Sequence, residues 1–195
     1  MSSENIQNEN AATQDQSYAI KFINPEAVVS KLGLEPGIVV ADFGCGSGYF
    51  SLPVARKIGE QGVVYSFDIL PQCLESIESQ AKAAGITNIV AKRANLEKQG
   101  GSKLPDSSCD WVIMKDMLFQ NKDKSVILAE AGRVLKDSGK ILLIEWNSSA
   151  DSSIGPDRSL RIAKEALVEI IQKSGLGVFK EIPVSDFHYG LILIK

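Results

Sequence analysis

The chain has 195 residues, of which 44% are hydrophobic and 23% are charged, and it carries a net charge of −3. This length and composition predict a single domain with one sizeable core. Because the chain is mildly acidic and has no run of Lys and Arg, the sequence argues against a nucleic-acid partner.

Cysteine usage and hydropathy bear on the compartment. Cys45, Cys73 and Cys109 lie far apart and match no metal-ligand spacing, so we expect reduced thiols and no metal. No apolar run approaches the roughly 20 residues of a membrane span, and the polar N-terminus lacks the apolar core of a signal peptide. These features predict a cytoplasmic protein.

The first segment is polar. Residues 1–16 are rich in Ser, Asn, Gln and Glu, which predicts a disordered tail, with the folded domain at 17–195. Asn24 and Pro25 form a helix start, with Asn as the cap and Pro in the first turn, and Gly33 is the expected end of that helix.

Strand and helix signals then alternate along the chain. Apolar and β-branched runs predict strands, and apolar residues spaced three and four apart predict helices. The expected strands cover 38–43, 63–68, 88–92, 111–114 and 140–145. The expected helices end at Ile58, run from Pro71 to Gly85, cover 124–135 and include 162–171, with a turn at 105–108 before the fourth strand and another at 137–139 before the fifth.

The last two strand-like runs, 178–184 and 189–194, are separated by a short loop. A parallel crossover needs a dozen residues or more, so these two strands must pair antiparallel. The sequence therefore predicts a parallel α/β sheet that ends in an antiparallel hairpin.

The stretch 42–48 carries the most specific motif. It reads D-x-G-x-G-x-G after a strand, and the third glycine of the nicotinamide fingerprint would fall on Tyr49 or Ser51, so that fingerprint fails. Asp68 follows at the end of the next strand, at the spacing of one βαβ unit. An acid there lies beside the glycine turn and can accept ribose hydroxyls, although it could also be a helix cap or a loop acid.

These residues resemble the class I S-adenosylmethionine (SAM) methyltransferases, most closely the small ubiquinone/menaquinone-biosynthesis type. Leu104–Val112 is similar to the approach to their fourth strand. Residues 132–140 are similar to their turn into strand five, with Asp137 where that pattern has Pro. The resemblance covers about residues 20–195. It implies an α/β fold with one Rossmann-like, seven-stranded sheet, helices on both faces and an antiparallel C-terminal hairpin.

The resemblance also implies where SAM binds. The glycines would expose backbone to the methionine part, Asp68 would hold the ribose, and Ile69 would pack on the adenine. Asn95 could meet the adenine edge or be a turn residue. The implied cofactor-binding residues are Asp42, Gly44, Cys45, Gly46, Gly48, Asp68, Ile69, Asn95, Leu96 and Lys115.

Catalytic candidates lie at the carboxyl edge of the sheet, and a base is needed only if the acceptor is protonated. We expect Asp116, His188 and Tyr189 there, with Glu145 also near a strand end. Lys115 and Asp116 could instead form an ion pair, and His188 could be structural. The expected acceptor pocket is formed by Tyr18, Phe22, residues 115–118, Trp146, His188 and Tyr189.

The resemblance implies an enzyme that methylates a small molecule or a protein side chain. The alternative is a non-catalytic SAM-binding module that acts by interaction, or a subunit of a larger complex. Intact glycines and Asp68 favour the enzyme. The acceptor atom and the oligomeric state do not follow from the sequence.

Overall fold

A sheet of seven strands organises the structure, a computed structural model that describes residues 22–150 and 154–195. The predictions for residues 1–16 and for Tyr18 lie outside these described residues. The strand order is β3-β2-β1-β4-β5-β7-β6. The strands are β1 (Val39–Phe43), β2 (Val63–Asp68), β3 (Ile89–Arg93), β4 (Cys109–Lys115), β5 (Leu135–Trp146), β6 (Gly177–Ser185) and β7 (His188–Ile194).

Strand directions confirm the predicted fold class. β1 pairs in parallel with β2 and β4, and β3 and β5 extend the parallel sheet on either side. β7 runs antiparallel between β5 and β6, as the short connection between the last two strands required. All five parallel strands therefore end at the same edge of the sheet.

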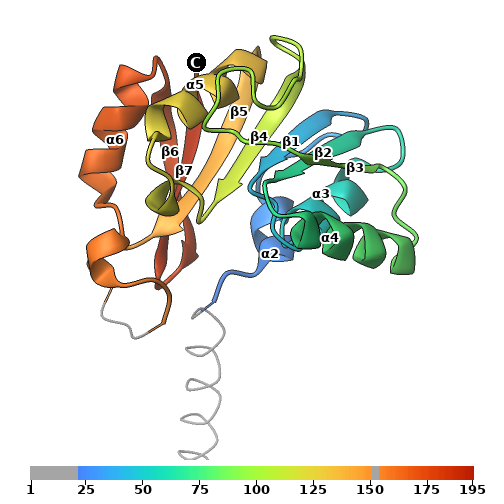
Figure 1. The fold of residues 1–195 in the computed structure, drawn as a ribbon, viewed down its shortest axis with the longest axis horizontal. Coiled ribbons are helices and arrows are strands. Elements are labelled where there is room, and N and C mark those ends of the chain that lie inside the picture. The colour runs from blue at the N-terminus through green and yellow to red at the C-terminus, as the bar shows by residue number, and fades with distance from the viewer. Residues whose placement is uncertain (1–21, 151–153) are drawn as a thin grey trace, which may run out of the picture.

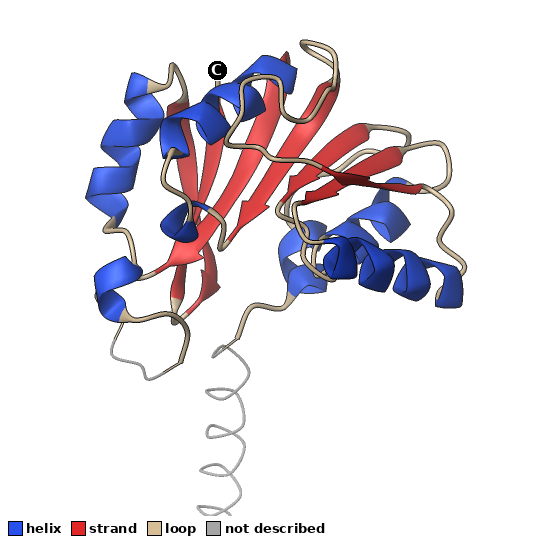
Figure 2. Ribbon diagram, viewed as in Figure 1, coloured by secondary structure: helices blue, strands red, loops and turns tan. Residues whose placement is uncertain are grey.

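Helices cover both faces (Figures 1 and 2). α5 and α6 lie on one face, and α2, α3 and α4 lie on the other (Figure 1). Residues 94–108, which join β3 to β4, form turns and no helix (Figure 2). The helices are α2 (Pro25–Ser30), α3 (Ser51–Ile58), α4 (Pro71–Ala83), α5 (Lys124–Val134) and α6 (Lys164–Lys173), with 3-10 turns η1 (Leu118–Gln120) and η2 (Arg158–Leu160).

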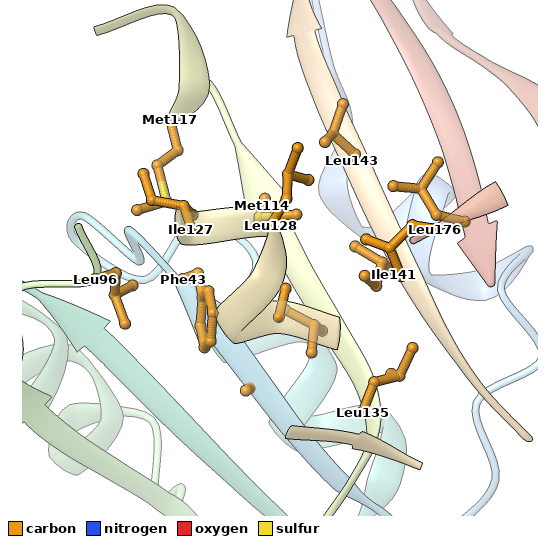
Figure 3. Close-up of a cluster of buried hydrophobic side chains, with 14 of the residues drawn as sticks. Phe43, Leu96, Met114, Met117, Ile127, Leu128, Leu135, Ile141, Leu143 and Leu176 are labelled. Carbon is orange, nitrogen blue, oxygen red and sulfur yellow. The ribbon is translucent and has the colours of Figure 1, made fainter. Parts of the chain in front are cut away.

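Alternating residues of the central strands divide the core into two layers, as expected for a sheet buried on both faces. Ala41 of β1 packs in the layer under α5 and α6, whereas its neighbour Val40 packs in the layer under α2 and α3. Figure 3 shows the first layer, where Leu128 of α5 packs in the same cluster as Phe43 of β1 and Leu143 of β5.

Helix α2 begins as predicted, because Asn24 Oδ1 accepts a hydrogen bond from the Ala27 N–H at 2.9 Å. The helix ends at Ser30, before Gly33. The next two residues form hydrogen bonds to the carbonyl three residues earlier. Lys31 N–H donates to the Val28 carbonyl at 3.0 Å, and Leu32 N–H donates to the Val29 carbonyl at 3.2 Å. Gly33 then turns the chain toward β1.

The turn expected at 137–139 is a bulge inside β5. The register passes from Cys109 opposite Leu135 to Trp111 opposite Lys140, so the intervening residues of β5 loop out of the ladder. Leu135 is fully buried, and Lys136 pairs with Asp110 at 2.8 Å. These two contacts hold the start of β5 against β4, and the expected turn is confined to the residues between.

Candidate functional site

A cavity of about 440 Å³ opens at the carboxyl ends of the parallel strands, where ligands bind in open α/β sheets. Four carboxylates and a single lysine are among its lining residues, so its charged lining is net negative. The lining comprises Asp42, Gly44, Cys45, Gly46, Ser47, Tyr49, Phe50, Phe67, Asp68, Ile69, Leu70, Ala94, Asn95, Leu96, Glu97, Lys115, Asp116, Met117, Gln120 and Asn121.

The glycine loop divides into a cavity-facing part and a packing part. Gly46 has φ +52, and a Cβ built there meets no atom within 4 Å. Gly48 has φ +94, and a Cβ there would lie 2.8 Å from Ile77 Cγ1 of α4. Gly46 therefore leaves bare backbone beside the cavity, whereas Gly48, which is outside the lining, lets α4 pack against the loop.

Asp68 fastens the glycine loop to the end of β2. Its Oδ2 accepts from Gly46 N–H at 2.9 Å, and its Oδ1 accepts from Leu70 N–H at 3.0 Å. The N–H groups of Gly44 and Cys45 both donate to the Phe67 carbonyl at 2.9 Å. Each carboxylate oxygen of Asp68 keeps a second lone-pair direction for a ligand hydroxyl.

Asp42 is buried near the end of β1, and a hydrogen bond from α3 holds its side chain. Ser51 Oγ, in the first turn of α3, donates to Asp42 Oδ2 at 2.5 Å, and Ser66 Oγ of β2 donates to Ser51 Oγ at 2.8 Å. Burial and, to a smaller extent, the nearby charge of Asp68 together raise the pKa of Asp42 to about 6, against the opposing effect of the Ser51 hydrogen bond. These hydrogen bonds offset part of the cost of burying the Asp42 carboxylate at the strand end.

An apolar wall and a polar loop flank Asp68. Ile69 and Leu70 line the cavity with about half of each residue exposed, at 50% and 47%. On the β3 side, Leu96 is buried, and Asn95 Oδ1 accepts from Glu97 N–H at 3.0 Å. The side chain of Asn95 therefore stabilises a turn, which was one of the two roles considered from the sequence, and the residue also lines the cavity.

Lys115 ends β4 at the cavity, and Asp116 follows it. Their side chains form an ion pair, as the sequence also allowed, and both line the cavity. Asp116 adopts φ +51, which is uncommon outside glycine. Its N–H still donates to the Ile144 carbonyl of β5 at 2.9 Å, so the chain leaves the sheet only after this hydrogen bond.

His188 lies behind Asp116 and outside the cavity lining. Its Nε2 is 3.2 Å from Asp116 Oδ1, and the His188 side chain is only 7% exposed. The imidazole packs on Trp146 with ring centroids 4.0 Å apart. His188 therefore lies beside a cavity residue, although it does not face the cavity itself.

Tyr189 and Phe22 also lie outside the lining. The Tyr189 hydroxyl donates to the Ile162 carbonyl at 3.1 Å, and burial, followed by the charges of Glu145 and Glu165, raises its pKa. Phe22 is 63% exposed and packs near Phe187, with ring centroids 6.0 Å apart. In this structure, residues 115–117 are the part of the expected acceptor pocket that lines the cavity; the pocket as a whole stays a prediction.

Glu145, at the end of β5, is 1% exposed. Its Oε1 accepts from Leu118 N–H at 2.5 Å and so anchors η1 beside the cavity. Burial and, to a smaller extent, the charge of Asp116 together raise the pKa of Glu145 to about 7, against the opposing effect of backbone hydrogen bonds. Glu145 is thus an anchor of the cavity wall.

Sequence reasoning missed several lining residues. Tyr49 lines the cavity, donates to the Ile23 carbonyl and lies under the Lys115 ammonium, 5.4 Å from the ring centroid. Glu97 Oε1 accepts from Lys122 N–H at 2.8 Å, which ties the β3 loop to the loop before α5. Tyr49 directly follows the glycines and could have been found, but no local pattern indicates the contact of Glu97.

The fold and site define a Rossmann-like protein with a ligand site at the carboxyl edge of its sheet. Residues 34–176 match the family model described as "Methyltransferase domain", and the chain belongs to that family. This match confirms the predicted methyltransferase family, and the seven-stranded sheet confirms the predicted fold.

Curated relatives are similar over part of their length. A demethylmenaquinone methyltransferase of Geobacillus kaustophilus is 28% identical over 120 residues, which is 62% of this chain and 50% of the relative. The ubiquinone/menaquinone biosynthesis C-methyltransferase UbiE of Francisella philomiragia is 30% identical over 132 residues, 67% of this chain and 52% of the relative. The chain spans about half the length of these relatives.

A solved structure agrees over more of the chain. The crystal structure of a SAM-dependent methyltransferase from Aquifex aeolicus has a TM-score of 0.81 and 23% identity, covering 89% of this chain and 91% of that one. At this identity the similarity establishes the fold. Within the described residues, no helix is long and apolar enough to cross a membrane.

Proposed function

We propose that this chain binds SAM in the cavity and transfers its methyl group to a small-molecule acceptor in the cytoplasm. The observation that carries the proposal is the bare backbone of Gly46 at the cavity, tied by its N–H to the carboxylate of Asp68. Family membership and the printed activities of the curated relatives support it.

The residues present fit the ligand. A lining with four carboxylates and one lysine suits a ligand that carries a sulfonium and an ammonium group. Exposed Ile69 and Leu70 offer an apolar face to an aromatic base, and Asp68 keeps acceptor capacity for ribose hydroxyls. Asp42, Gly44 and Gly46 would meet the methionine part, and Asn95 and Leu96 the adenine edge.

SAM supplies an electrophilic methyl group on a positively charged sulfur. The protein therefore has little covalent chemistry to perform, and its residues align the reactants and exclude water. The glycine loop, fixed by Asp68 and Phe67, forms one wall. Lys115, Asp116 and Met117 form the wall at the end of β4, where we place the acceptor.

Isothermal titration with SAM and with NAD tests the proposal. We expect SAM to bind and NAD to give no heat. Asp68→Ala should weaken SAM binding at least tenfold, because charge-assisted hydrogen bonds contribute roughly 1.5–3 kcal/mol each. Asp137→Ala is the matched control, since the Asp137 side chain is 97% exposed. Heat from NAD and none from SAM would contradict the proposal.

Turnover separates the enzyme from a binding module. The assay measures loss of the methyl group from SAM over a panel of small hydroxyl, amine and thiol compounds, with a protein-peptide pool as a second set. Methylation of a small molecule supports the proposal. Tight SAM binding with methylation of the peptide pool alone would favour a protein acceptor, and binding with no methylation in either set would favour the interaction module.

A further inference from the structure

Asp116 is held in an unusual backbone conformation at the cavity. Its φ of +51 costs energy for a residue with a Cβ, and such conformations persist only where surrounding contacts determine them. Its N–H remains bonded to Ile144, and its side chain is 15% exposed at the cavity wall. The contacts of its carboxylate therefore decide where this group points.

Two nitrogen groups face that carboxylate from different elements. Lys115 contacts Oδ2 from the same strand end. His188 Nε2, at the start of β7, lies 3.2 Å from Oδ1. Glu145 at the end of β5 also acts on this group, because its buried carboxyl and Asp116 interact electrostatically.

The other side of the imidazole is fixed too. His188 Nδ1 lies 2.9 Å from Ser185 Oγ, and that oxygen already accepts from Phe187 N–H at 3.2 Å. The hydroxyl proton of Ser185 is then free to point at Nδ1. When that hydroxyl donates to Nδ1, the imidazole proton lies on Nε2, facing Asp116, because the partner of one ring nitrogen sets the proton on the other.

The contact between His188 and Asp116 is close but incomplete. Asp116 Oδ1 and His188 Nε2 are both buried, and neither makes a well-aligned hydrogen bond within the described residues. Hydrogen bonds of this kind often align only when the substrate is bound. A small movement of Asp116 would align this pair.

We propose that His188 is a positioning residue, which holds the carboxylate of Asp116 toward the acceptor, and that Asp116 removes the proton of a hydroxyl acceptor. This inference rests on the proposed function. As the new bond from the acceptor oxygen to the methyl carbon forms, the O–H bond breaks and its proton moves to Asp116. The sulfur–methyl bond breaks at the same time, and its electron pair stays on sulfur.

The arrangement also limits the acceptor. An amine that is already unprotonated needs no carboxylate base to attack a methyl group, whereas a neutral hydroxyl loses its proton during the reaction. A carboxylate fixed at the cavity wall thus favours hydroxyl acceptors over tertiary amines and thioethers.

His188 is the only histidine, so its imidazole nitrogens can be observed without ambiguity by nitrogen-15 NMR. We expect the proton on Nε2 and a marked change in the Nε2 resonance in Asp116→Asn. The exposed control Asp137→Asn should leave both nitrogens unchanged. A neutral imidazole with its proton on Nδ1, or an Nε2 resonance that ignores Asp116→Asn, would overturn the positioning role.

Methyl transfer to catechol, compared with trimethylamine and dimethyl sulfide, tests the acceptor class. We expect transfer to catechol, a kcat at least tenfold lower in His188→Leu with unchanged SAM affinity, and partial recovery in His188→Gln, which keeps a side-chain N–H. Transfer only to the amine or the thioether, or no transfer to catechol by protein that binds SAM, would overturn the hydroxyl class. Failure of the wild type to bind SAM would instead reject the proposed function, and the NMR result would stand separately.

Discussion

Replacing Glu145 with Gln should remove a pH-dependent cost of folding. In the folded protein burial raises the pKa of Glu145 from 4.5 to about 7. A raised pKa contributes stability that is fully present below pH 4.5 and is lost as the pH rises through about 7. The rise corresponds to about 3 kcal/mol, at about 1.4 kcal/mol per pH unit.

The structure allows Gln at this position to keep the hydrogen bond that Glu145 makes. Glu145 Oε1 accepts from Leu118 N–H, and the amide oxygen of Gln can keep this bond. Glu145 Oε2 makes no hydrogen bond within the described part of the chain, so replacing it with an amide nitrogen breaks none there. The amide nitrogen adds the cost of its buried N–H donors, but that cost does not depend on pH, so the change with pH reports the charge.

Urea unfolding between about pH 5.5 and about pH 8.5, at constant ionic strength, measures the effect. The free energy of unfolding of Glu145→Gln minus that of the wild type should increase by about 2 kcal/mol across this range and level off above pH 7. Asp42 also titrates, but it is present in both proteins. Glu169→Gln, on a side chain that is 72% exposed, should show no such trend. A flat difference for Glu145→Gln would refute the reasoning.

Three further substitutions test the glycine loop and the loop before β4. Gly48→Ala should lower the free energy of unfolding by about 2 kcal/mol because its Cβ would meet Ile77, whereas Gly46→Ala should weaken SAM binding more than it lowers stability. Urea unfolding and SAM titration of both variants measure these effects. A larger loss of stability in Gly46→Ala and a larger loss of SAM binding in Gly48→Ala would contradict the division of the loop into a cavity-facing and a packing part. Burial raises the pKa of Glu130, but hydrogen bonds from Arg133 and Ser102 outweigh it and lower the pKa to about 2. Glu130→Gln should therefore cost about 3 kcal/mol near pH 7, a difference that shrinks as the pH falls from 4.5 toward 2, and equal stability of the two proteins at pH 7 would exclude this role.

Sequence patterns predicted those features of the fold that depend on neighbouring residues. β2 ends at Asp68 and α3 ends at Ile58, as the apolar runs and the following turn residues indicated. The antiparallel ending followed from loop length alone, because a short connection cannot return a parallel strand. Each of these depends on residues that are neighbours in the sequence.

Packing between distant elements could not be read in the same way. The glycine spacing shows that a turn leaves β1, but only the position of α4 shows that Gly48 serves packing against Ile77. The bulge in β5 depends on how Lys136 and Leu135 meet β4. A lone histidine gives no signal for its partners, and Ser185 and Asp116 reach His188 from two different elements.

The carboxyl edge of the sheet gathers acids, and two of them have a raised pKa. Asp68 raises the pKa of Asp42, and Asp116 raises that of Glu145. Such crowding is unfavourable in the free protein, since like charges at close range disfavour ionisation. A cationic ligand at this edge would relieve that repulsion, whereas a neutral or anionic ligand of the same shape would not. The acids of this edge would therefore favour a ligand by its charge as well as by its hydrogen bonds, and under the proposed function they would distinguish SAM from its uncharged-sulfur product.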